Sequence, residues 1–144
     1  MRCAELMRRR LAILLPERTV LEAARMMREY GCGILPVVDA ERRLLGVVTD
    51  RDIVVRACAS GARLDSTPVS SIMSKDVVAC ELNEPLSVAE ELMIQHRVQR
   101  LPVLEGGKIV GILSLTDIAQ VEEPLRVARL VREITARELR LEHP

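Results

Sequence analysis

Apolar positions along this chain alternate between short continuous runs, typical of buried strands, and stripes at helical spacing. In the first half, Thr19 and Glu22 have the spacing of a capping box, which predicts a helix start. The expected elements are, in order, a strand at 11–15, a turn at 16–18, a helix from Thr19 to Gly31, hairpin strands at 34–38 and 44–48, and a second helix starting near 49–52. The pattern is β-α-β-β-α.

The second half follows the same order of elements. Pro85 is suited to the first turn of a helix, because the amide hydrogen that proline lacks has no partner there. The expected elements are a strand at 77–80, a helix at 85–96, strands at 101–104 and 109–113 around the turn 105–108, and a helix from 116.

Individual residues also recur, at an offset of 66 positions early in each copy and 65 later. The matched residues are Met7 and Met73, Ala23 and Ala89, Met27 and Met93, Leu35-Pro36-Val37 and Leu101-Pro102-Val103, Gly46 and Gly111, and Asp52-Ile53 and Asp117-Ile118. An internal repeat determines the whole architecture. We predict an α+β fold with a first repeat at 1–60, a linker at 61–69, a second repeat at 70–123 and a helical tail at 124–144.

Each repeat is too small to bury enough apolar surface alone, so we expect the two to pack together. The tail is rich in arginine and carries apolar residues on one helical stripe across 125–141, with Arg129–Glu133 and Glu133–Arg137 as stabilising pairs. Two interpretations stay open for this helix. It docks on its own domain, or it packs on a partner subunit.

Composition narrows the classes of function. The chain has 21 basic and 21 acidic residues and a single aromatic residue, Tyr30, which disfavours nucleic acid as a partner. Cysteines 3, 32, 58 and 80 form no C-x-x-C pair, which argues against zinc and against a disulfide framework, and favours buried or half-buried thiols in a reducing compartment. No apolar run approaches membrane-spanning length, and we expect a cytoplasmic protein.

Each repeat ends in a glycine, two apolar residues, a hydroxyl residue, two variable residues and an aspartate. Thr49 and Asp52 are the polar pair of the first copy, and Ser114 and Asp117 are that of the second. At a strand-to-helix junction, the hydroxyl and nearby N–H groups suit a phosphate, and the carboxylate suits a ribose diol. The same spacing also describes a capping box that only starts a helix.

These segments, the repeated Leu-Pro-Val strands and the element order resemble a tandem pair of cystathionine-β-synthase (CBS) domains, called a Bateman module, over about residues 4–122. The resemblance implies two repeats related by pseudo-two-fold symmetry. It also implies a non-catalytic regulatory protein that binds AMP, ADP or ATP, or less readily S-adenosylmethionine or NADH, in a cleft between the repeats. It further implies a homodimer, and a stand-alone module of this kind would act in trans on another protein.

The resemblance assigns a role to each residue that matches the family's motif. Asp52 and Asp117 would hold ribose. Phosphate contacts would come from Thr49, Arg51, Arg100, Ser114 and Thr116, with His96 and Arg97 as further candidates. The base and pocket walls would involve Ala12, Cys32, Gly33, Ile34 and Pro36 in the first repeat, and Val78, Val98, Gln99, Arg100 and Pro102 in the second. The open Cys32-Gly33 favours the first site, whereas the bulkier Gln99-Arg100 either adds a phosphate ligand or closes the second.

A second function fits the same residues: a ligand-free dimer that serves as a structural or stress-related interaction module, with both motifs acting as helix caps. An enzyme is disfavoured because the sequence has no paired-carboxylate, Cys-His, Ser-His, G-x-G-x-x-G or Walker motif. We therefore expect no catalytic residues, no catalytic cofactor and no metal.

Overall fold

The chain folds into two compact units whose boundaries do not follow the order of the sequence. The computed structural model describes residues 1–136. The first unit contains Ala12–Val77 together with Gly107–Ile109. The second contains Met1–Leu11, Val78–Gly106 and the described residues from Val110 to Ala136. The N-terminal segment therefore belongs to the unit that holds most of the second repeat.

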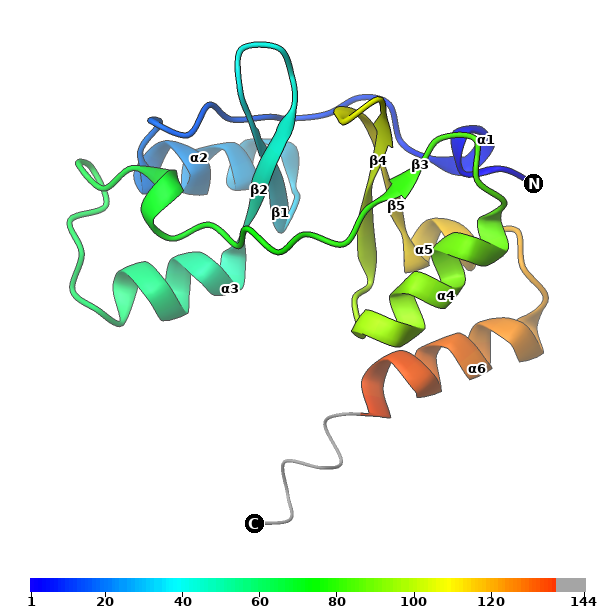
Figure 1. The fold of residues 1–144 in the computed structure, drawn as a ribbon. Coiled ribbons are helices and arrows are strands. Elements are labelled where there is room, and N and C mark those ends of the chain that lie inside the picture. The colour runs from blue at the N-terminus through cyan, green and yellow to red at the C-terminus, as the bar shows by residue number, and fades with distance from the viewer. Residues whose placement is uncertain (137–144) are drawn as a thin grey trace. The chain divides into compact units, whose positions relative to one another are not determined.

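The first unit's long helix, α2 (Val20–Tyr30), forms where the sequence predicts it (Figure 1). Thr19 Oγ1 accepts a hydrogen bond from the Glu22 N–H at 3.2 Å, and Glu22 Oε2 accepts one from the Thr19 N–H at 3.1 Å. The helix ends at Gly31, whose φ of 63° is left-handed and therefore favours glycine. The capping box and the glycine stop are both confirmed.

The hairpin of the first unit is also confirmed. Strands β1 (Ile34–Val38) and β2 (Leu44–Thr49) are antiparallel, with Leu35 opposite Val48. Four of the five residues of β1 are buried, so this strand lies inside the core of its unit. The last residue of β2 is Thr49, the first hydroxyl of the repeated motif.

The predicted strand at 11–15 is wrong as an extended element. It shrinks to one parallel bridge between Leu14 and Val37. The Leu14 N–H donates to the Pro36 carbonyl at 2.9 Å, and the Val38 N–H donates to the Leu14 carbonyl at 2.8 Å. The apolar run still contributes to the core through Leu14, which is 3% exposed.

The second helix of the first unit starts as predicted but changes its winding. Helix α3 (Asp50–Asp52) continues directly into η1 (Ile53–Cys58), which is a π-helix. Residues 53–55 are three β-branched side chains in a row, which weakens the α-helical preference at this point. A short 3₁₀ turn, η2 (Val69–Ser71), follows within the stretch after the helix.

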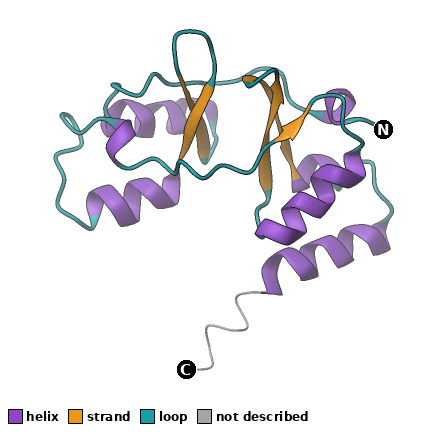
Figure 2. Cartoon of the chain, viewed as in Figure 1, coloured by secondary structure: helices purple, strands orange, loops and turns teal. Residues whose placement is uncertain are grey.

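The second unit contains a three-stranded sheet of order β3–β4–β5 (Figure 2). The strands are β3 (Cys80–Glu81), β4 (Arg100–Glu105) and β5 (Lys108–Ser114), and β3 runs parallel to β4. The predicted strand at 77–80 is therefore correct only at its last residue. Two short helices belong to this unit, α1 (Cys3–Leu6) before the sheet and α5 (Leu115–Ile118) after it.

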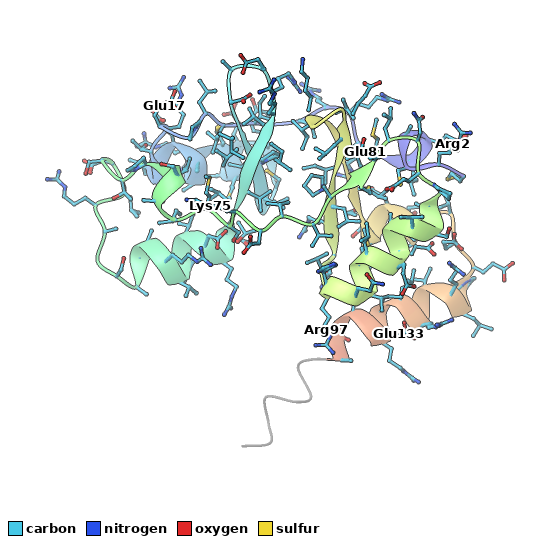
Figure 3. The ribbon with its side chains drawn as sticks, in the orientation of Figure 1. Arg2, Glu17, Lys75, Glu81, Arg97 and Glu133 are labelled. Atoms are coloured by element: carbon cyan, nitrogen blue, oxygen red, sulfur yellow. The ribbon has the colours of Figure 1, made fainter. Side chains whose placement is uncertain are left out.

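Helix α4 (Leu86–His96) corresponds to α2 of the first unit. Pro85 is its N-cap, one residue before the helix, because its ψ of 147° is extended; the expectation of Pro85 in the first helical turn was wrong by one position. Arg97 ends the helix with a φ of 54°, where the first repeat has Gly31 (Figure 3). The two repeats therefore stop equivalent helices with different residues.

A glycine in the second hairpin strand of each unit accepts a close approach from another segment. A Cβ on Gly46 would lie 2.7 Å from the Ser74 carbonyl oxygen and 3.0 Å from the Met73 sulfur. A Cβ on Gly111 would lie 2.5 Å from the Met7 sulfur. The repeated methionines therefore pack on the repeated glycines, each in the unit formed largely by the other repeat.

The C-terminal helix α6 (Pro124–Thr135) packs along α4 in the second unit (Figure 1). Leu130 and Ile134 are each 3% exposed and belong to the core of that unit. Docking on its own unit, one of the two interpretations of this segment, is thus what α6 does. The Arg129–Glu133 pair is present at 2.9 Å, whereas the partner Arg137 and the rest of the predicted helix lie outside the described residues.

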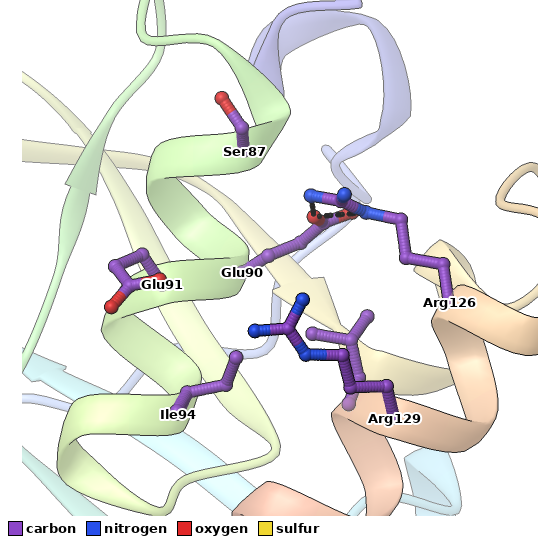
Figure 4. A pocket seen from close by; sticks show the side chains of 7 residues that line it. Ser87, Glu90, Glu91, Ile94, Arg126 and Arg129 are labelled. Atoms are coloured by element: carbon purple, nitrogen blue, oxygen red, sulfur yellow. Dashed lines mark hydrogen bonds and ion pairs between the residues drawn. The ribbon is translucent and has the colours of Figure 1, made fainter.

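A buried carboxylate lies between these two helices. Glu90 of α4 is 2% exposed, and its Oε2 accepts hydrogen bonds from Nε of Arg126 at 2.8 Å and from Nη2 (Figure 4). Its Oε1 has no partner within the described chain. Burial raises the pKa of Glu90 above its ordinary value of 4.5, although Arg126 opposes the shift. A small pocket of about 70 Å³ lies between the helices here.

Glu90→Gln is expected to change the pH dependence of stability. A raised pKa means that the folded chain binds the Glu90 proton more tightly than the unfolded chain, so this stabilisation is complete below pH 4.5 and is lost as the pH rises through the folded pKa. Glu90→Gln cannot bind this proton, so its free energy of unfolding should not fall in that pH range on account of residue 90. Urea unfolding from pH 4 to pH 8 measures it, with the exposed Glu91→Gln as control; parallel curves for wild type and Glu90→Gln would contradict the expectation.

Gly46→Ala and Gly111→Ala are both expected to destabilise the fold, by about 1–3 kcal/mol each, which is typical of overpacking. The larger cost should fall on Gly46→Ala, because the nearest atom there is a backbone oxygen, whereas at Gly111 it belongs to a flexible methionine side chain. Denaturant unfolding of the two variants compares them. An equal or reversed order would show that the methionine segments do not pack as described.

Candidate functional site

The first copy of the motif forms a strand-to-helix junction in the first unit, which we call the first junction: Gly33, Thr49, Asp50 and Asp52. Thr49 Oγ1 accepts from the Asp52 N–H at 3.1 Å, and Asp52 Oδ2 accepts from the Thr49 N–H at 3.0 Å. The Asp50 N–H donates to the Gly33 carbonyl at 3.0 Å, which ties the helix start to β1. The segment is a complete capping box.

Asp52 is held by more than its own cap. Its side chain is 9% exposed. The Ser74 hydroxyl donates to its carboxylate at 3.3 and 3.4 Å, and Nε of Arg56, one turn further along the helix, lies 3.6 Å from Oδ1. Hydroxyl, backbone and guanidinium donors therefore surround this buried carboxylate, as a buried polar group requires.

Asp50 adds a second carboxylate to the first junction. A Cβ on Gly33 would lie 3.0 Å from Oδ2 of Asp50, so this side chain lies directly over the glycine backbone. Asp50 Oδ1 accepts from the Arg51 N–H at 2.9 Å. Glycine at position 33 leaves room for this approach, and the carboxylate lies beside residues 32–34, where the family resemblance implies a ligand base.

The second copy forms the second junction, in the second unit: Gln99, Ser114, Leu115 and Asp117. Ser114 Oγ accepts from the Asp117 N–H at 3.1 Å and donates to Asp117 Oδ2 at 2.7 Å. Oδ2 also accepts from the Ser114 N–H at 3.1 Å. The Leu115 N–H donates to the Gln99 carbonyl at 2.8 Å, as Asp50 does to Gly33.

Asp117 receives its further donor from the N-terminal segment. Nε of Arg8 lies 3.0 Å from Asp117 Oδ1, with the two side chains 69% and 12% exposed. The backbones of Arg8 and Ile112 exchange hydrogen bonds at 2.8 and 3.0 Å, as Ser74 and Val47 do in the first unit at 2.9 and 3.0 Å. Arg8 and Ser74 are therefore equivalent positions that approach equivalent aspartates.

The other sequence-predicted residues divide between the same two units. In the first unit, Ala12 and Cys32 pack against the core, Ile34 pairs with Thr49, and Arg51 is exposed. Pro36 is buried within β1. These residues are close to the first junction along the sequence. The hydrogen bonds that form the junction itself come from Gly33, Asp50 and the Thr49–Asp52 capping pair.

In the second unit, Val78 and Val98 pack against the core, Pro102 is buried in β4, and Arg100 and Thr116 are exposed. Of the two further phosphate candidates, His96 is exposed at the end of α4 and Arg97 is half-buried. Gln99 is exposed, and its carbonyl belongs to the junction.

Four contributors were missed by sequence reasoning: Arg8, Asp50, Arg56 and Ser74. Asp50 was treated as a variable position of the motif. The signal for Arg8 and Ser74 was present, because they follow the repeated methionines Met7 and Met73 at the same offset. What the sequence did not reveal was that each segment lies beside the other repeat's motif.

The junction helices are short, and their caps already use the nearest donors. Helix α3 has three residues and α5 has four. The N–H groups of Asp52 and Asp117 donate to the hydroxyls of their own caps. A phosphate at either junction must therefore rely chiefly on side-chain donors.

Among residues 1–136 there is no cluster of three or more potential metal ligands, and no helix combines the length and apolarity needed to cross a membrane.

The family model described as "CBS domain" matches two segments of the chain, residues 3–57 and 69–123. A CBS domain-containing protein of Bacillus subtilis, YhcV, is 42% identical over 75% of this chain and 76% of its own length. Hypoxic response protein 1 of Mycobacterium tuberculosis is 30% identical over 81% of each chain. Inosine-5′-monophosphate dehydrogenase of Methanocaldococcus jannaschii is 37% identical, but the match covers 22% of that enzyme.

Solved structures agree on the fold. Hypoxic Response Protein I, solved with two coordinated zinc ions, has a TM-score of 0.79 at 28% identity and covers 85% of this chain and all of its own. The CBS domain pair of protein MJ0100, solved with 5′-methylthioadenosine and S-adenosyl-L-methionine, has a TM-score of 0.75 over 84% of this chain and 94% of its own. Its identity is 22%, so this likeness shows the fold alone.

Loss of either capping hydroxyl is expected to destabilise the fold. Thr49→Ala and Ser114→Ala each remove the acceptor of an N–H in the first helical turn, which typically costs about 1 kcal/mol, whereas Thr49→Ser keeps it. Thr116→Ala, at an exposed neighbouring position, serves as the matched control. Equal stabilities of Thr49→Ala and Thr49→Ser in denaturant unfolding would contradict a capping role.

Proposed function

This chain belongs to the family of CBS-domain proteins, and we propose that it is a regulatory protein that binds an adenosine nucleotide, of the AMP, ADP or ATP class, at its two junctions. One observation carries the proposal. Each repeat places an almost fully buried aspartate at the same strand-to-helix junction, with side chains only 9% and 12% exposed. Helix capping alone is satisfied by an exposed residue, and aspartate is rarely this little exposed unless it is paired, so the burial in both copies favours a role beyond capping.

The carboxylates provide the chemistry that ribose needs. Oδ2 of each aspartate is engaged by the N–H of its capping residue, while Oδ1 of Asp52 and of Asp117 faces only side-chain donors. Those donors can move away or share the oxygen, so we assign Oδ1 to the 2′,3′-diol. The base would lie against residues 32–34 in the first unit and residues 98–100 in the second, as the family resemblance implies. Arg51, Arg100 and Thr116 are exposed and available for phosphate.

Regulation follows if the ligand binds one conformation of the protein better than another, because a ligand shifts an equilibrium only by that difference. We propose that the occupied protein acts in trans on a separate protein target, as a homodimer and without catalysis of its own. The stand-alone relatives support a non-enzymatic role, and the matched enzyme contains far more than the CBS region.

A ligand-free interaction module is the second candidate, and the junction contacts favour it in one respect. Both carboxylates already have donors within the protein. Asp52 accepts from the Thr49 N–H and the Ser74 hydroxyl and lies beside Arg56, and Asp117 accepts from the N–H and hydroxyl of Ser114 and from Arg8. A fold that needs nothing further at these positions is stable without a ligand. The two candidates differ in a single measurable property, which is the binding of adenosyl compounds.

The proposal is tested by thermal-shift and calorimetric titration with AMP, ADP, ATP, NADH, S-adenosylmethionine and 5′-methylthioadenosine. A ligand that binds only the folded chain stabilises it by about 2.7 kcal/mol at one hundred times its Kd. We expect a saturable response that weakens in Asp52→Ala and Asp117→Ala and persists in Asp65→Ala, whose side chain is 58% exposed. Asp52→Asn and Asp117→Asn keep a cap acceptor and control for lost stability. A folded wild type that binds none of the compounds would establish the interaction module instead.

A further inference from the structure

The two junctions have the same backbone but different charges. The first has Asp50 at the position where the second has Leu115, since both donate their N–H to the opposing strand residue. The first has Ser74 at the position where the second has Arg8, since both pair with the second hairpin strand and reach the aspartate. Both exchanges make the first junction more negative and the second more positive.

In the first junction the extra negative charge lies close to the backbone. The Asp50 carboxylate lies over Gly33, at 3.0 Å from where a Cβ would be. Arg56 lies 3.6 Å from Asp52 Oδ1 and offsets the charge of that carboxylate, so the uncompensated anion is Asp50. A phosphate brought to this surface meets Asp50, and two anions at short range repel each other. An uncharged or cationic group meets an acceptor there instead.

Each junction has a guanidinium beside its aspartate, Arg56 in the first and Arg8 in the second, but the second has Leu115 in place of the further carboxylate of Asp50. Arg8 donates to Asp117 Oδ1 at 3.0 Å, and its side chain is 69% exposed, so it can turn toward a ligand at little cost. Arg100 is exposed at the start of β4, at the position that the apolar Ile34 occupies in β1. Guanidinium groups bind phosphate oxygens by charge-assisted hydrogen bonds.

We propose that the two junctions differ in the ligand charge that they prefer: the second favours a phosphorylated adenosine compound, and the first favours an adenosine compound without phosphate. Arg8 and Asp50 are the residues that set this difference. The proposal rests on the proposed function, because it assumes that both junctions hold an adenosine group. It adds the class of ligand at each.

The test compares AMP with adenosine by calorimetry on the full chain and on single variants. Each variant copies the residue of the other junction or removes only the charge: Arg8→Ser, Asp50→Leu and Asp50→Asn. Because both side chains are exposed, we expect modest changes of about two- to fivefold in the ratio of the AMP affinity to the adenosine affinity. Arg8→Ser should lower this ratio, and both Asp50 variants should raise it.

Assignment to individual junctions uses Asp52→Ala, which leaves the second junction, and Asp117→Ala, which leaves the first. The Asp52→Ala protein should prefer AMP and the Asp117→Ala protein should prefer adenosine. Arg10→Ser, which removes an exposed arginine of the same segment, is the control for nonspecific loss of positive charge. If an aspartate variant does not fold, the opposite effects of Arg8→Ser and Asp50→Asn on the otherwise unchanged chain still decide the question.

The outcomes separate the two levels of the proposal. If the wild type binds neither AMP nor adenosine, the proposed function fails and the charge selection fails with it. If both compounds bind, but Arg8→Ser and Asp50→Asn leave the affinity ratio unchanged or move it in the same direction, the charge selection is wrong and the nucleotide-binding function stands. An effect of Arg10→Ser equal to that of Arg8→Ser also overturns the role of Arg8.

Discussion

The close packing of a methionine-bearing segment on a strand glycine organises each unit. At Gly46 and Gly111 a side chain of any size would meet a backbone oxygen or a methionine sulfur within 3.1 Å. The absence of a Cβ lets the incoming backbone form hydrogen bonds with the strand, and the next residue then reaches the buried aspartate. Hairpin, incoming segment and junction are therefore one connected arrangement, and the close approach comes from outside the repeat that supplies the strand.

This arrangement gives the junction aspartates two tasks. As caps they satisfy a backbone N–H at the start of a helix, and as buried carboxylates they attract a further donor from the incoming segment. The first task explains the spacing of the motif, and the second explains why the carboxylates are so little exposed. The backbone hydrogen bonds at the two junctions are nearly the same. The junctions differ in the side chains at the motif's variable positions and on the incoming segment.

Symmetry between the repeats is broken elsewhere too. Helix α4 carries Glu90, Glu91 and Ile94, where the equivalent positions of α2 are Ala24, Arg25 and Arg28. The arginine-rich α6 docks on the acidic helix, with Arg126 on Glu90 and with Leu130 and Ile134 in the core. Complementary charge thus accompanies the apolar contact. The equivalent positions of α2 carry two arginines and no carboxylate, so they offer no such partner for an arginine-rich helix.

Local sequence by itself determined most of the elements of this protein. The Thr19–Glu22 capping box, the Gly31 stop and the Leu-Pro-Val strands depend on neighbours within a few residues, so their patterns were sufficient. The repeated hydroxyl-to-aspartate spacing likewise identified both junctions. Tertiary structure alone decided that Leu14 forms a bridge rather than a strand, that Met1–Leu11 joins the other unit, and that Arg8, Ser74 and Asp50 reach the junctions. Those contacts join residues far apart in the sequence or depend on backbone approach, and no local periodicity encodes which distant segment will lie there.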